Sequence, residues 1–419
     1  MQKSTCLVPG LLLLNLLLCC SGYAAKKPGT IEQKAAAIHR AVITIDSHTD
    51  TPLQMVREGF DISVRHDSRK EYSKIDFPRM KEGGLDGAFF GVFVSQGPRN
   101  PEAYERIRQR TLMLFDTIAA SVGRNLAVAE LAVSPDDAIR LKKSGKRAVF
   151  IGIENGYAIG KDLSLLSTYY LKGARYLTLC HTKNNDIADS STDSTEHNGL
   201  SKYGYEVIQE MNHIGMMVDV SHISDKALKD VLAFTKAPVI ASHSCAKALC
   251  NNPRNLSDDL LRAIAKNGGV VQMCILSDYV KTPEPNPIRD SARAAIRRQF
   301  NNFDGLSDSA MKAARTAWST VNAQFPQKLA TVSDVVDHID HIVMVAGIDH
   351  VGIGTDFDGG GAVEGCFDVS EMGNITLELV KRGYSKNEIR KIWGGNLMRV
   401  MKKTDKVAQK YKSSCRCNT

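Results

Sequence analysis

The stretch Val149-Phe150-Ile151-Gly152-Ile153-Glu154 is apolar at every position until it ends in a carboxylate. A strand with one solvated face alternates apolar and polar residues, whereas a strand buried on both faces is apolar throughout. We therefore interpret the run Ala148–Glu154 as a strand of a parallel sheet that helices cover on both faces. Seven more runs have this character, and they are Val42–Asp46, Ala88–Val94, Arg175–Cys180, Met216–Ser221, Pro238–Ser242, Gly269–Ile275 and Val351–Asp356.

Amphipathic segments such as Pro101–Ala120 and Ser257–Asn267 separate these runs. Eight buried strands that alternate with helices predict an α/β fold, a (β/α)₈ barrel of the TIM type. A doubly wound sheet stays open as the alternative, because the sequence does not reveal the order of the strands. The longest interruption, at about 277–331, begins rich in proline and then becomes helical and charged. We interpret it as an insertion after the seventh strand, within a single catalytic domain that covers residues 25–402.

Composition narrows the classes of function. The 419 residues include 43% hydrophobic ones, which supports a large core, and the formal net charge is +8. Basic residues are scattered, and no basic stripe interleaved with aromatic residues is present, so the sequence disfavours nucleic-acid binding. The one local excess of basic residues lies near the end, and we expect residues 403–419 to form a solvated basic tail.

The first residues have the layout of a secretory signal peptide. Lys3 precedes an apolar run at 11–18, and small residues follow it up to Ala24. The apolar run is too short to span a bilayer, and no later segment reaches transmembrane length. We therefore expect residues 1–24 to be removed and the mature chain to be secreted or to reside in the periplasm or cell envelope. Lipidation at Cys19 or Cys20 is the alternative, although the residues just before them suit a lipobox poorly.

The chain has ten cysteines, three of which lie in the predicted signal peptide. An oxidising compartment permits disulfides, but the odd number that remains leaves at least one thiol without a partner within the chain. The spacing does not reveal how they would pair.

Polar residues follow several of the predicted strands. His48 and Asp50 come after the first strand, and residues two apart on an extended segment face the same side, so both can bind one ion. This His-x-Asp pattern is weak alone, since chance produces it often. Glu154 closes a buried strand, where an unpaired carboxylate would be costly. A salt bridge or a helix cap would explain Glu154 equally well.

Three further histidines, His181, His222 and His243, each follow a predicted strand. A single histidine in such a place is more often a structural group than a metal ligand. With His48, however, four of the eleven histidines lie just beyond strands, on what would be one rim of a barrel. Independent structural roles would not align in this way, so the pattern favours a metal site. The other histidines lie in predicted helices or loops, and we interpret them as structural.

The ligand set suits a hard or borderline metal, because it contains imidazoles and carboxylates without thiolates. It consists of His48, Asp50, Glu154, His222 and His243. Zinc fits best, with manganese or iron as substitutes, and two ions are held if one carboxylate bridges them. Two such ions can hold a hydroxide and polarise a carbonyl. Asp356, at the end of the last strand, is then left to take the proton from water and pass it to a leaving amine.

These segments together resemble the membrane (renal) dipeptidases of the amidohydrolase superfamily, from about Val42 to Val400. The resemblance rests on several motifs in the same order, and these are Ile45-Asp46-Ser47-His48-Thr49-Asp50, Gly152-Ile153-Glu154-Asn155-Gly156, Leu177-Thr178-Leu179-Cys180-His181, Ser221-His222-Ile223-Ser224, Ser242-His243-Ser244, Pro253-Arg254-Asn255 and Gly354-Thr355-Asp356-Phe357-Asp358-Gly359. It implies a (β/α)₈ barrel with two zinc ions. His48 and Asp50 would bind one ion, His222 and His243 the other, and Glu154 would bridge them.

The resemblance also implies roles for residues around the ions. Asp356 would be the general acid/base, and His181 would contact the substrate at the scissile carbonyl or its oxyanion. Arg254 would bind the free carboxylate of a dipeptide, a task that suits a planar guanidinium. The role of Arg254 rests on the resemblance alone. The expected reaction is hydrolysis of a dipeptide into two amino acids, and the family leaves a homodimer open.

Two rival functions remain. The same metal site could act on a cyclic amide or a lactone, although Arg254 and His181 favour a peptide. The second rival is a barrel that binds zinc without catalysis. Asp356 argues against this function, because a structural zinc site needs no general acid/base. A substrate panel separates all three functions.

Overall fold

A computed structural model describes residues 2, 4–5, 29–71, 73–303 and 306–416. Its sheet contains only parallel pairs, in the order β1-β2-β4-β5-β6-β7-β8-β9, with β3 paired to β4. The strands are β1 Ile45–Thr49, β2 Gly87–Phe93, β3 Ala129–Leu131, β4 Arg147–Glu154, β5 Ala174–Thr178, β6 Met217–Asp219, β7 Ile240–Ser244, β8 Val270–Met273 and β9 Val351–Ile353.

The first strand and the segment after the last strand close the sheet. Thr49 forms a parallel bridge with Phe357. The backbone N–H of Asp50 donates to the carbonyl of Phe357 at 2.8 Å, and that of Asp356 donates to the carbonyl of His48 at 3.0 Å. Strands that pair in the sheet therefore also follow one another in the sequence, apart from the short β3. The predicted (β/α)₈ barrel is confirmed, and the doubly wound sheet is excluded.

Strand limits differ from the prediction at β1 and at β7, which lies two residues later than the predicted Pro238–Ser242 and therefore contains His243. We expected a strand at Val42–Asp46, but β1 is Ile45–Thr49 and therefore contains His48. The difference arises at Thr44, whose N–H and hydroxyl bond to the Asp86 carboxylate and to Gly84 O instead of to a ladder. The sequence does not predict β3, which is three residues long and pairs with the first residues of β4.

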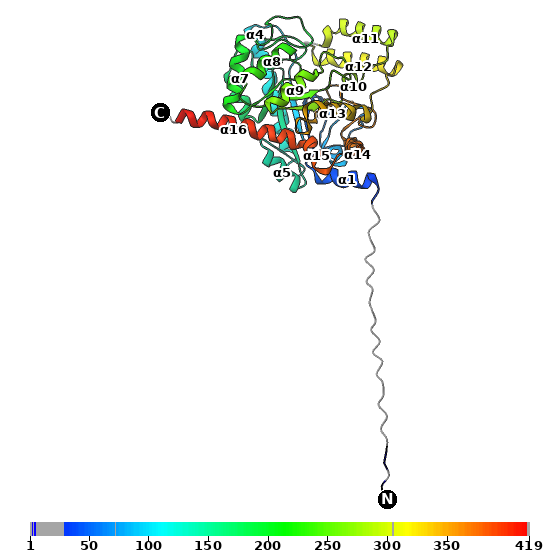
Figure 1. The fold of residues 1–419 in the computed structure, drawn as a ribbon. Coiled ribbons are helices and arrows are strands. Elements are labelled where there is room, and N and C mark those ends of the chain that lie inside the picture. The colour runs from blue at the N-terminus through cyan, green and yellow to red at the C-terminus, as the bar shows by residue number, and fades with distance from the viewer. Residues whose placement is uncertain (1, 3, 6–28, 72, 304–305, 417–419) are drawn as a thin grey trace.

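Helices surround the barrel in the order expected of alternating strands and helices (Figure 1). The main ones are α1 Ile31–Ala41, α4 Pro101–Gly123, α5 Pro135–Lys143, α6 Ser164–Leu171, α7 Lys202–Ile214, α8 Asp225–Phe234, α9 Asp258–Asn267, α13 Val332–Ala346, α14 Gly373–Lys381 and α16 Asn396–Arg416. Shorter helical segments are α2 Pro52–Met55, α3 Phe77–Glu82, α15 Lys386–Arg390, η1 Gly156–Ile159, η3 Ile348–His350, η4 Val369–Glu371 and the π-helix η5 Lys391–Gly395.

Side-chain caps explain where several of these helices begin. Asn100 accepts from the N–H of Ala103 and precedes a proline at the first position of α4. Ser257 accepts from the N–H of Leu260 and starts α9 one residue later than the segment that we predicted. Because the cap residue itself is not helical, such a difference of one residue is expected.

The predicted insertion at 277–331 is helical. It contains α10 Ser277–Val280, α11 Pro287–Gln299, the 3₁₀ turn η2 Asn301–Phe303 and α12 Asp308–Gln324. Figure 1 shows α11 and α12 side by side at one corner of the molecule, beyond α10. Gln327, just after α12, donates to the carboxylate of Asp278 on α10. This bond and the contacts of Arg293 with Asn322 and Gln327 tie the pair of helices to α10.

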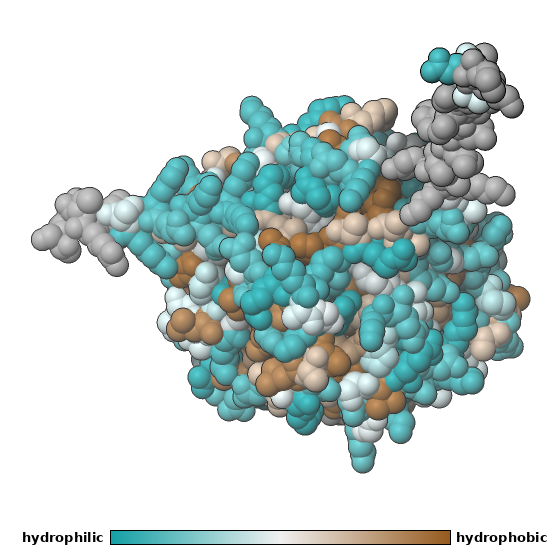
Figure 2. All heavy atoms as spheres, turned by 90° about the horizontal axis from the view of Figure 1, so that it is seen from below, coloured by the Kyte–Doolittle hydropathy of each residue, from teal (hydrophilic) through white to brown (hydrophobic). Residues whose placement is uncertain are grey.

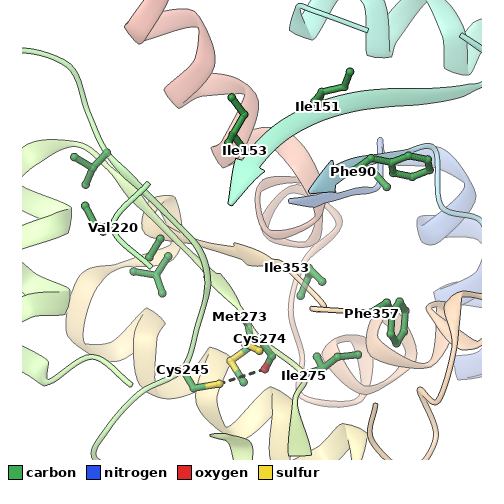
Figure 3. Packing of buried hydrophobic residues seen from close by; sticks show 14 of the residues in the cluster. Phe90, Ile151, Ile153, Val220, Cys245, Met273, Cys274, Ile275, Ile353 and Phe357 are labelled. Atoms are coloured by element: carbon green, nitrogen blue, oxygen red, sulfur yellow. Dashed lines mark hydrogen bonds between the residues drawn. The ribbon is translucent and has the colours of Figure 1, made fainter. Parts of the chain in front are cut away.

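The core has an inner and an outer part. The inner part contains one apolar or aromatic side chain from each of seven strands. Side chains from so many strands can pack together only inside the barrel. They are Ile45, Phe89, Phe150, Tyr176, Met217, Ile240 and Val270. Their sequence neighbours point outward and pack against the helices. Figure 3 shows part of this outer packing, with Phe90 and Ile151 on neighbouring strands.

The last helix covers the end of the barrel at which the strands begin. Leu397, Val400 and Met401 of α16 belong to the same buried cluster as the inner core. The predicted boundary at 402/403 lies within α16, where Thr404 and Ala408 are still buried and charged side chains alternate with them. Beyond these residues α16 extends away from the body (Figure 1). From below, hydrophilic side chains cover most of the surface, with small groups of hydrophobic ones between them (Figure 2).

Candidate metal centre

Strand β4 carries Glu154 into the mouth of the barrel. Side chains of a strand alternate between faces, so Phe150, Gly152 and Glu154 share the inward face. Phe150 lies in the inner core, and Glu154 comes two positions above Gly152 at the end of the strand. The side chain of Glu154 is 3% exposed. The sequence therefore places a buried carboxylate directly above an apolar floor.

Two strands change register where they present a histidine. The pairing of β1 with β2 shifts between Asp46 and Thr49, and the pairing of β7 with β8 shifts between Ala241 and Ser244. Such irregularities redirect a side chain that regular alternation would point elsewhere. His48 and His243 lie at these shifts, and their rings stack with centroids 4.0 Å apart.

Glu154 lies between two groups of histidines. Its Oε2 is 3.4 Å from Nε2 of His48. Its Oε1 is 3.0 Å from Nε2 of His222, 3.6 Å from Nε2 of His243 and 3.7 Å from Nε2 of His181. Each carboxylate oxygen thus faces a different group, which is the arrangement that a bridging carboxylate needs.

Donor atoms converge on three points around Glu154. The groups within 4.8 Å of one another are His48, Glu154 and His243; Glu154, His181 and His222; and His48, Asp50 and Asp356. The structure therefore brings together all five predicted ligands, and it adds His181 and Asp356 to their surroundings.

Several of these donor atoms lack a hydrogen bond. Among the described residues, His48 Nε2, Asp50 Oδ1 and His222 Nδ1 are buried and have no hydrogen-bond partner. Nε2 of His222 and Nε2 of His243 lie 2.8 Å apart, where two neutral imidazoles can share at most one proton. Buried polar atoms without partners cost free energy, so such a concentration of them indicates a site for a ligand. Metal cations suit these atoms, because all of them are nitrogen or oxygen donors.

Two site residues adopt a backbone conformation that is rare outside glycine. His222 has φ 72° and Asp356 has φ 60°. A left-handed conformation costs of order 1–3 kcal/mol at such a residue, and it tends to occur where function requires it. The fold therefore holds both side chains in the site at the expense of backbone strain.

Burial and neighbouring charges shift the pKa values of the site. Burial lowers the pKa of His222 and of His243 well below the ordinary value, so both imidazoles are neutral and can donate a lone pair. Burial would raise the pKa of Glu154, but the neighbouring imidazoles of His48 and His222 outweigh it and hold the pKa well below its usual range. Glu154 is therefore ionised.

Asp356 and Asp50 lie close together. Burial raises the pKa of Asp356 well above the ordinary value, and Cys274 and Asp50 raise it further. Gly359 makes this proximity feasible, because a Cβ there would lie 2.0 Å from Asp50 Oδ2 and 2.3 Å from Asp356 Oδ1. A carboxyl that gains a proton readily beside a metal site suits the role of general acid/base.

The two predicted substrate contacts lie at the edge of this centre. The side chain of His181 is 23% exposed and packs edge-on against Phe93. Arg254 is 4% exposed, donates from Nη2 to the carbonyl of His243 at 3.2 Å, and lies over the ring of Tyr279. Its Nε is buried and, among the described residues, has no hydrogen-bond partner. Arg254 therefore keeps donors available beside the metal centre.

Sequence reasoning missed the residues behind the histidines. The hydroxyl of Tyr176 lies 2.8 Å from Nδ1 of His48. The hydroxyl of Ser242 lies 2.8 Å from Nδ1 of His243 and donates to the carboxylate of Asp219. No signal marked Tyr176, since an aromatic residue in an apolar strand is ordinary core.

Five cysteines in the body of the barrel are unpaired. Cys180, Cys245, Cys250, Cys274 and Cys366 are free and buried. Cys245 donates to the carbonyl of Cys274, and Figure 3 shows both within the apolar packing beside the barrel.

Comparison with known proteins gives a consistent result. Residues 32–415 match the family model described as membrane dipeptidase (peptidase family M19). Dipeptidase 3 of Macaca fascicularis is 31% identical over 402 residues, which cover 92% of this chain and 71% of that protein. Dipeptidase tcpJ of Claviceps purpurea is 32% identical over 378 residues, covering 88% of this chain and 78% of that protein.

Solved structures share the fold. The probable dipeptidase PvdM from Pseudomonas aeruginosa matches with a TM-score of 0.78 and 30% identity, over 90% of this chain and 99% of that one. A metallo peptidase from Rhodobacter sphaeroides, solved with a phosphinate mimic of the dipeptide L-Ala-D-Ala, matches with a TM-score of 0.70 and 21% identity, over 87% of this chain and 99% of that one. At that identity the second likeness shows the fold alone.

Proposed function

The chain belongs to the membrane dipeptidase family, peptidase family M19, and from this premise we propose that it is a two-zinc dipeptidase that splits dipeptides into two amino acids. Its relatives are dipeptidases, and the chain is a peptide-bond hydrolase. The observation that carries the finer proposal is Glu154, whose two oxygens face different groups of ligand atoms. A structural site for one ion would need only one such group.

We assign the ligands by their place around Glu154. His48 and Asp50 would hold one ion beside Oε2, and His222 and His243 would hold the other beside Oε1. Nε2 of His48 and Oδ1 of Asp50, which are buried without partners in the described structure, support the first of these assignments, because an ion would satisfy both atoms. When bound, zinc supplies a Lewis acid for the peptide carbonyl and makes water a nucleophile at neutral pH.

Asp356 is the group that we assign to proton transfer. It lies beside His48 and Asp50, and none of the five proposed ligand roles requires it. Its raised pKa lets it accept the proton of the attacking water and then donate it to the departing nitrogen of the dipeptide. One carboxyl thus serves both halves of the reaction.

His181 and Arg254 would orient the substrate. His181 is partly exposed next to Glu154 Oε1, so a ligand that enters the mouth meets its ring. Arg254 offers buried donors that fit the free carboxylate of a dipeptide. A substrate held at both groups would have its peptide carbonyl between them, over the metal centre.

The rival substrates remain part of the test. A lactone or a cyclic amide lacks the free carboxylate that Arg254 would bind, and a non-catalytic zinc protein has no use for Asp356. We expect L,L- and L,D-dipeptides to be hydrolysed, and N-acyl amino acids and cyclic amides to react much more slowly. Preferred hydrolysis of a cyclic amide would overturn the proposed substrate class.

The experiment for the mechanism is Asp356→Asn, with zinc content and dipeptide turnover measured on the same sample. We expect zinc to stay near two ions per chain while turnover falls roughly 10²–10⁴-fold, the usual contribution of general acid–base catalysis. Asp259→Asn is the matched control, since that side chain is 91% exposed on α9. Turnover of Asp356→Asn within a factor of a few of wild type would refute the role.

We also propose that residues 1–24 are a signal peptide and that the catalytic domain is exported; lipidation at Cys19 or Cys20 is the alternative. These residues lie outside the described parts of the chain, apart from 2 and 4–5. Among the helices of the described residues, none has the length and apolar character to cross a membrane. The mass of the mature N-terminus tests the cleavage, and the mass of the native protein in solution tests a homodimer.

A further inference from the structure

Tyr176 lies beneath the metal centre, inside the barrel. It belongs to β5, is 0% exposed, and its ring stacks with that of Phe89, with centroids 5.3 Å apart. Its hydroxyl points up to β1, where it lies 2.8 Å from Nδ1 of His48. One side chain of the apolar floor therefore connects to a proposed metal ligand on a strand that is not its neighbour.

Gly152 makes room for this ring. Gly152 and Tyr176 are register partners on β4 and β5, and both face the interior. A Cβ at position 152 would lie 2.0 Å from Cζ of Tyr176 and 2.4 Å from both neighbouring ring carbons. The missing side chain on β4 and the long one on β5 are thus complementary, and together they fix where the hydroxyl lies.

The hydroxyl bonds to Nδ1 of His48, and Nε2 stays without a hydrogen-bond partner in the described structure. A neutral imidazole has one N–H and one lone pair, and the hydrogen bond made by one nitrogen selects the state of the other. Nε2 of His48 faces Glu154 at 3.4 Å and Asp50 at 3.8 Å. If Nδ1–H donates to the hydroxyl of Tyr176, the lone pair of Nε2 points at these carboxylates.

The second pair of ligands has a similar support on one member. Nδ1 of His243 lies 2.8 Å from the hydroxyl of Ser242, and that hydroxyl donates to Asp219 at 2.6 Å. Because the Ser242 hydroxyl uses its proton on Asp219, it can only accept from His243. His243 then keeps a lone pair on Nε2, the same tautomer that His48 needs to bind an ion through Nε2.

We propose that Tyr176 is a positioning residue, which holds the ring and the tautomer of His48 so that Nε2 binds the ion shared with Asp50. This inference rests on the proposed function, since it takes His48 as a metal ligand. Tyr176 touches neither substrate nor ion, so its effect must appear first in metal binding. Gly152 acts through Tyr176 and should give the same effect when its space is filled.

The test is Tyr176→Phe in the zinc-loaded full chain, measured by zinc release to increasing concentrations of a chelator. Loss of such supporting hydrogen bonds typically weakens metal binding roughly 10–100-fold, and we expect a shift of this size for one of the two ions. Turnover should fall at limiting zinc and recover in excess zinc. Tyr169→Phe is the matched control, because that buried hydroxyl donates to Ala158 O instead, and its zinc release should equal wild type.

Two further variants separate the outcomes. Gly152→Ala should shift zinc release in the same direction as Tyr176→Phe, while Gly123→Ala should not, since a Cβ at position 123 meets no atom within 4 Å. His48→Ala tests the premise, and unchanged zinc content in it would refute the proposed ligand role. If His48→Ala loses zinc but Tyr176→Phe releases it as wild type does, the role of Tyr176 is refuted, even if Tyr176→Phe melts at a lower temperature.

Discussion

Replacing Arg254 by methionine should remove the recognition of the substrate carboxylate while leaving the metal centre in place. Methionine keeps much of the length of the side chain but has no donor and no charge. The guanidinium has five N–H donors, one of which bonds to the carbonyl of His243. Nε is buried without a partner in the described structure, so it and a neighbouring Nη can form a bidentate pair with a carboxylate.

The size of the effect follows from burial. Arg254 is 4% exposed, so water and salt screen the pair little. Truncating one partner of a buried, hydrogen-bonded charge pair costs about 2–5 kcal/mol, which corresponds to a loss of roughly 30- to 4,000-fold in kcat/KM. The loss should fall on substrates that carry the carboxylate.

The assay compares a dipeptide with its C-terminal amide, for wild type and Arg254→Met, with zinc content measured on each sample. Wild type should prefer the dipeptide, and the variant should lose that preference because its activity on the amide changes little. Arg262→Met is the control, since that guanidinium is 57% exposed on α9. An equal loss on both substrates, at unchanged zinc, would refute carboxylate recognition by Arg254.

Two predictions concern stability. Burial lowers the pKa of His39 below 6.5, the ordinary value that it has in the unfolded chain. Below pH 6.5 the unfolded chain therefore binds a proton more readily than the folded chain does, and the free energy of unfolding falls. Wild type should therefore lose more melting temperature than His39→Gln between about pH 7.5 and about pH 5.5; an equal loss would contradict the prediction. Leu397→Ala, at a site 2% exposed beneath the barrel, should lower the free energy of unfolding by about 2–5 kcal/mol in denaturant titration while kcat per folded molecule stays the same. A large fall in kcat would show that α16 affects the metal centre.

The sequence predicts the strands and the rim of this barrel well, for a local reason. An apolar run that ends in a polar residue, as at Glu154, predicts two things from one short segment. The apolar part predicts a buried strand, and the polar residue predicts where that strand reaches the open end of the barrel. His48, His222 and His243 follow the same rule, even though register shifts at β1 and β7 decide how two of them point. Those shifts depend on the partner strand, so a single segment does not reveal them.

The features that the sequence does not predict depend on contacts between distant segments. Tyr176 looks like core until Gly152 is placed beside it and His48 above it. Strand β3 exists because the first residues of β4 offer it an edge, and its three residues alone carry no pattern. The sequence predicts a solvated basic tail from residue 403, and only the closed barrel shows that apolar side chains of α16 cover its far end.

The filled interior closes one end of the barrel to the substrate. Phe89, Phe150 and Tyr176 occupy the barrel below the metal centre, and α16 covers the end beneath them. In the part of the chain that the structure describes, a dipeptide and its products therefore cannot pass through the barrel to its far end. The amino acid that carries the original C-terminal carboxylate would be the one that Arg254 still holds, so it should leave last. It should then compete with incoming substrate, and accumulated product should slow the reaction.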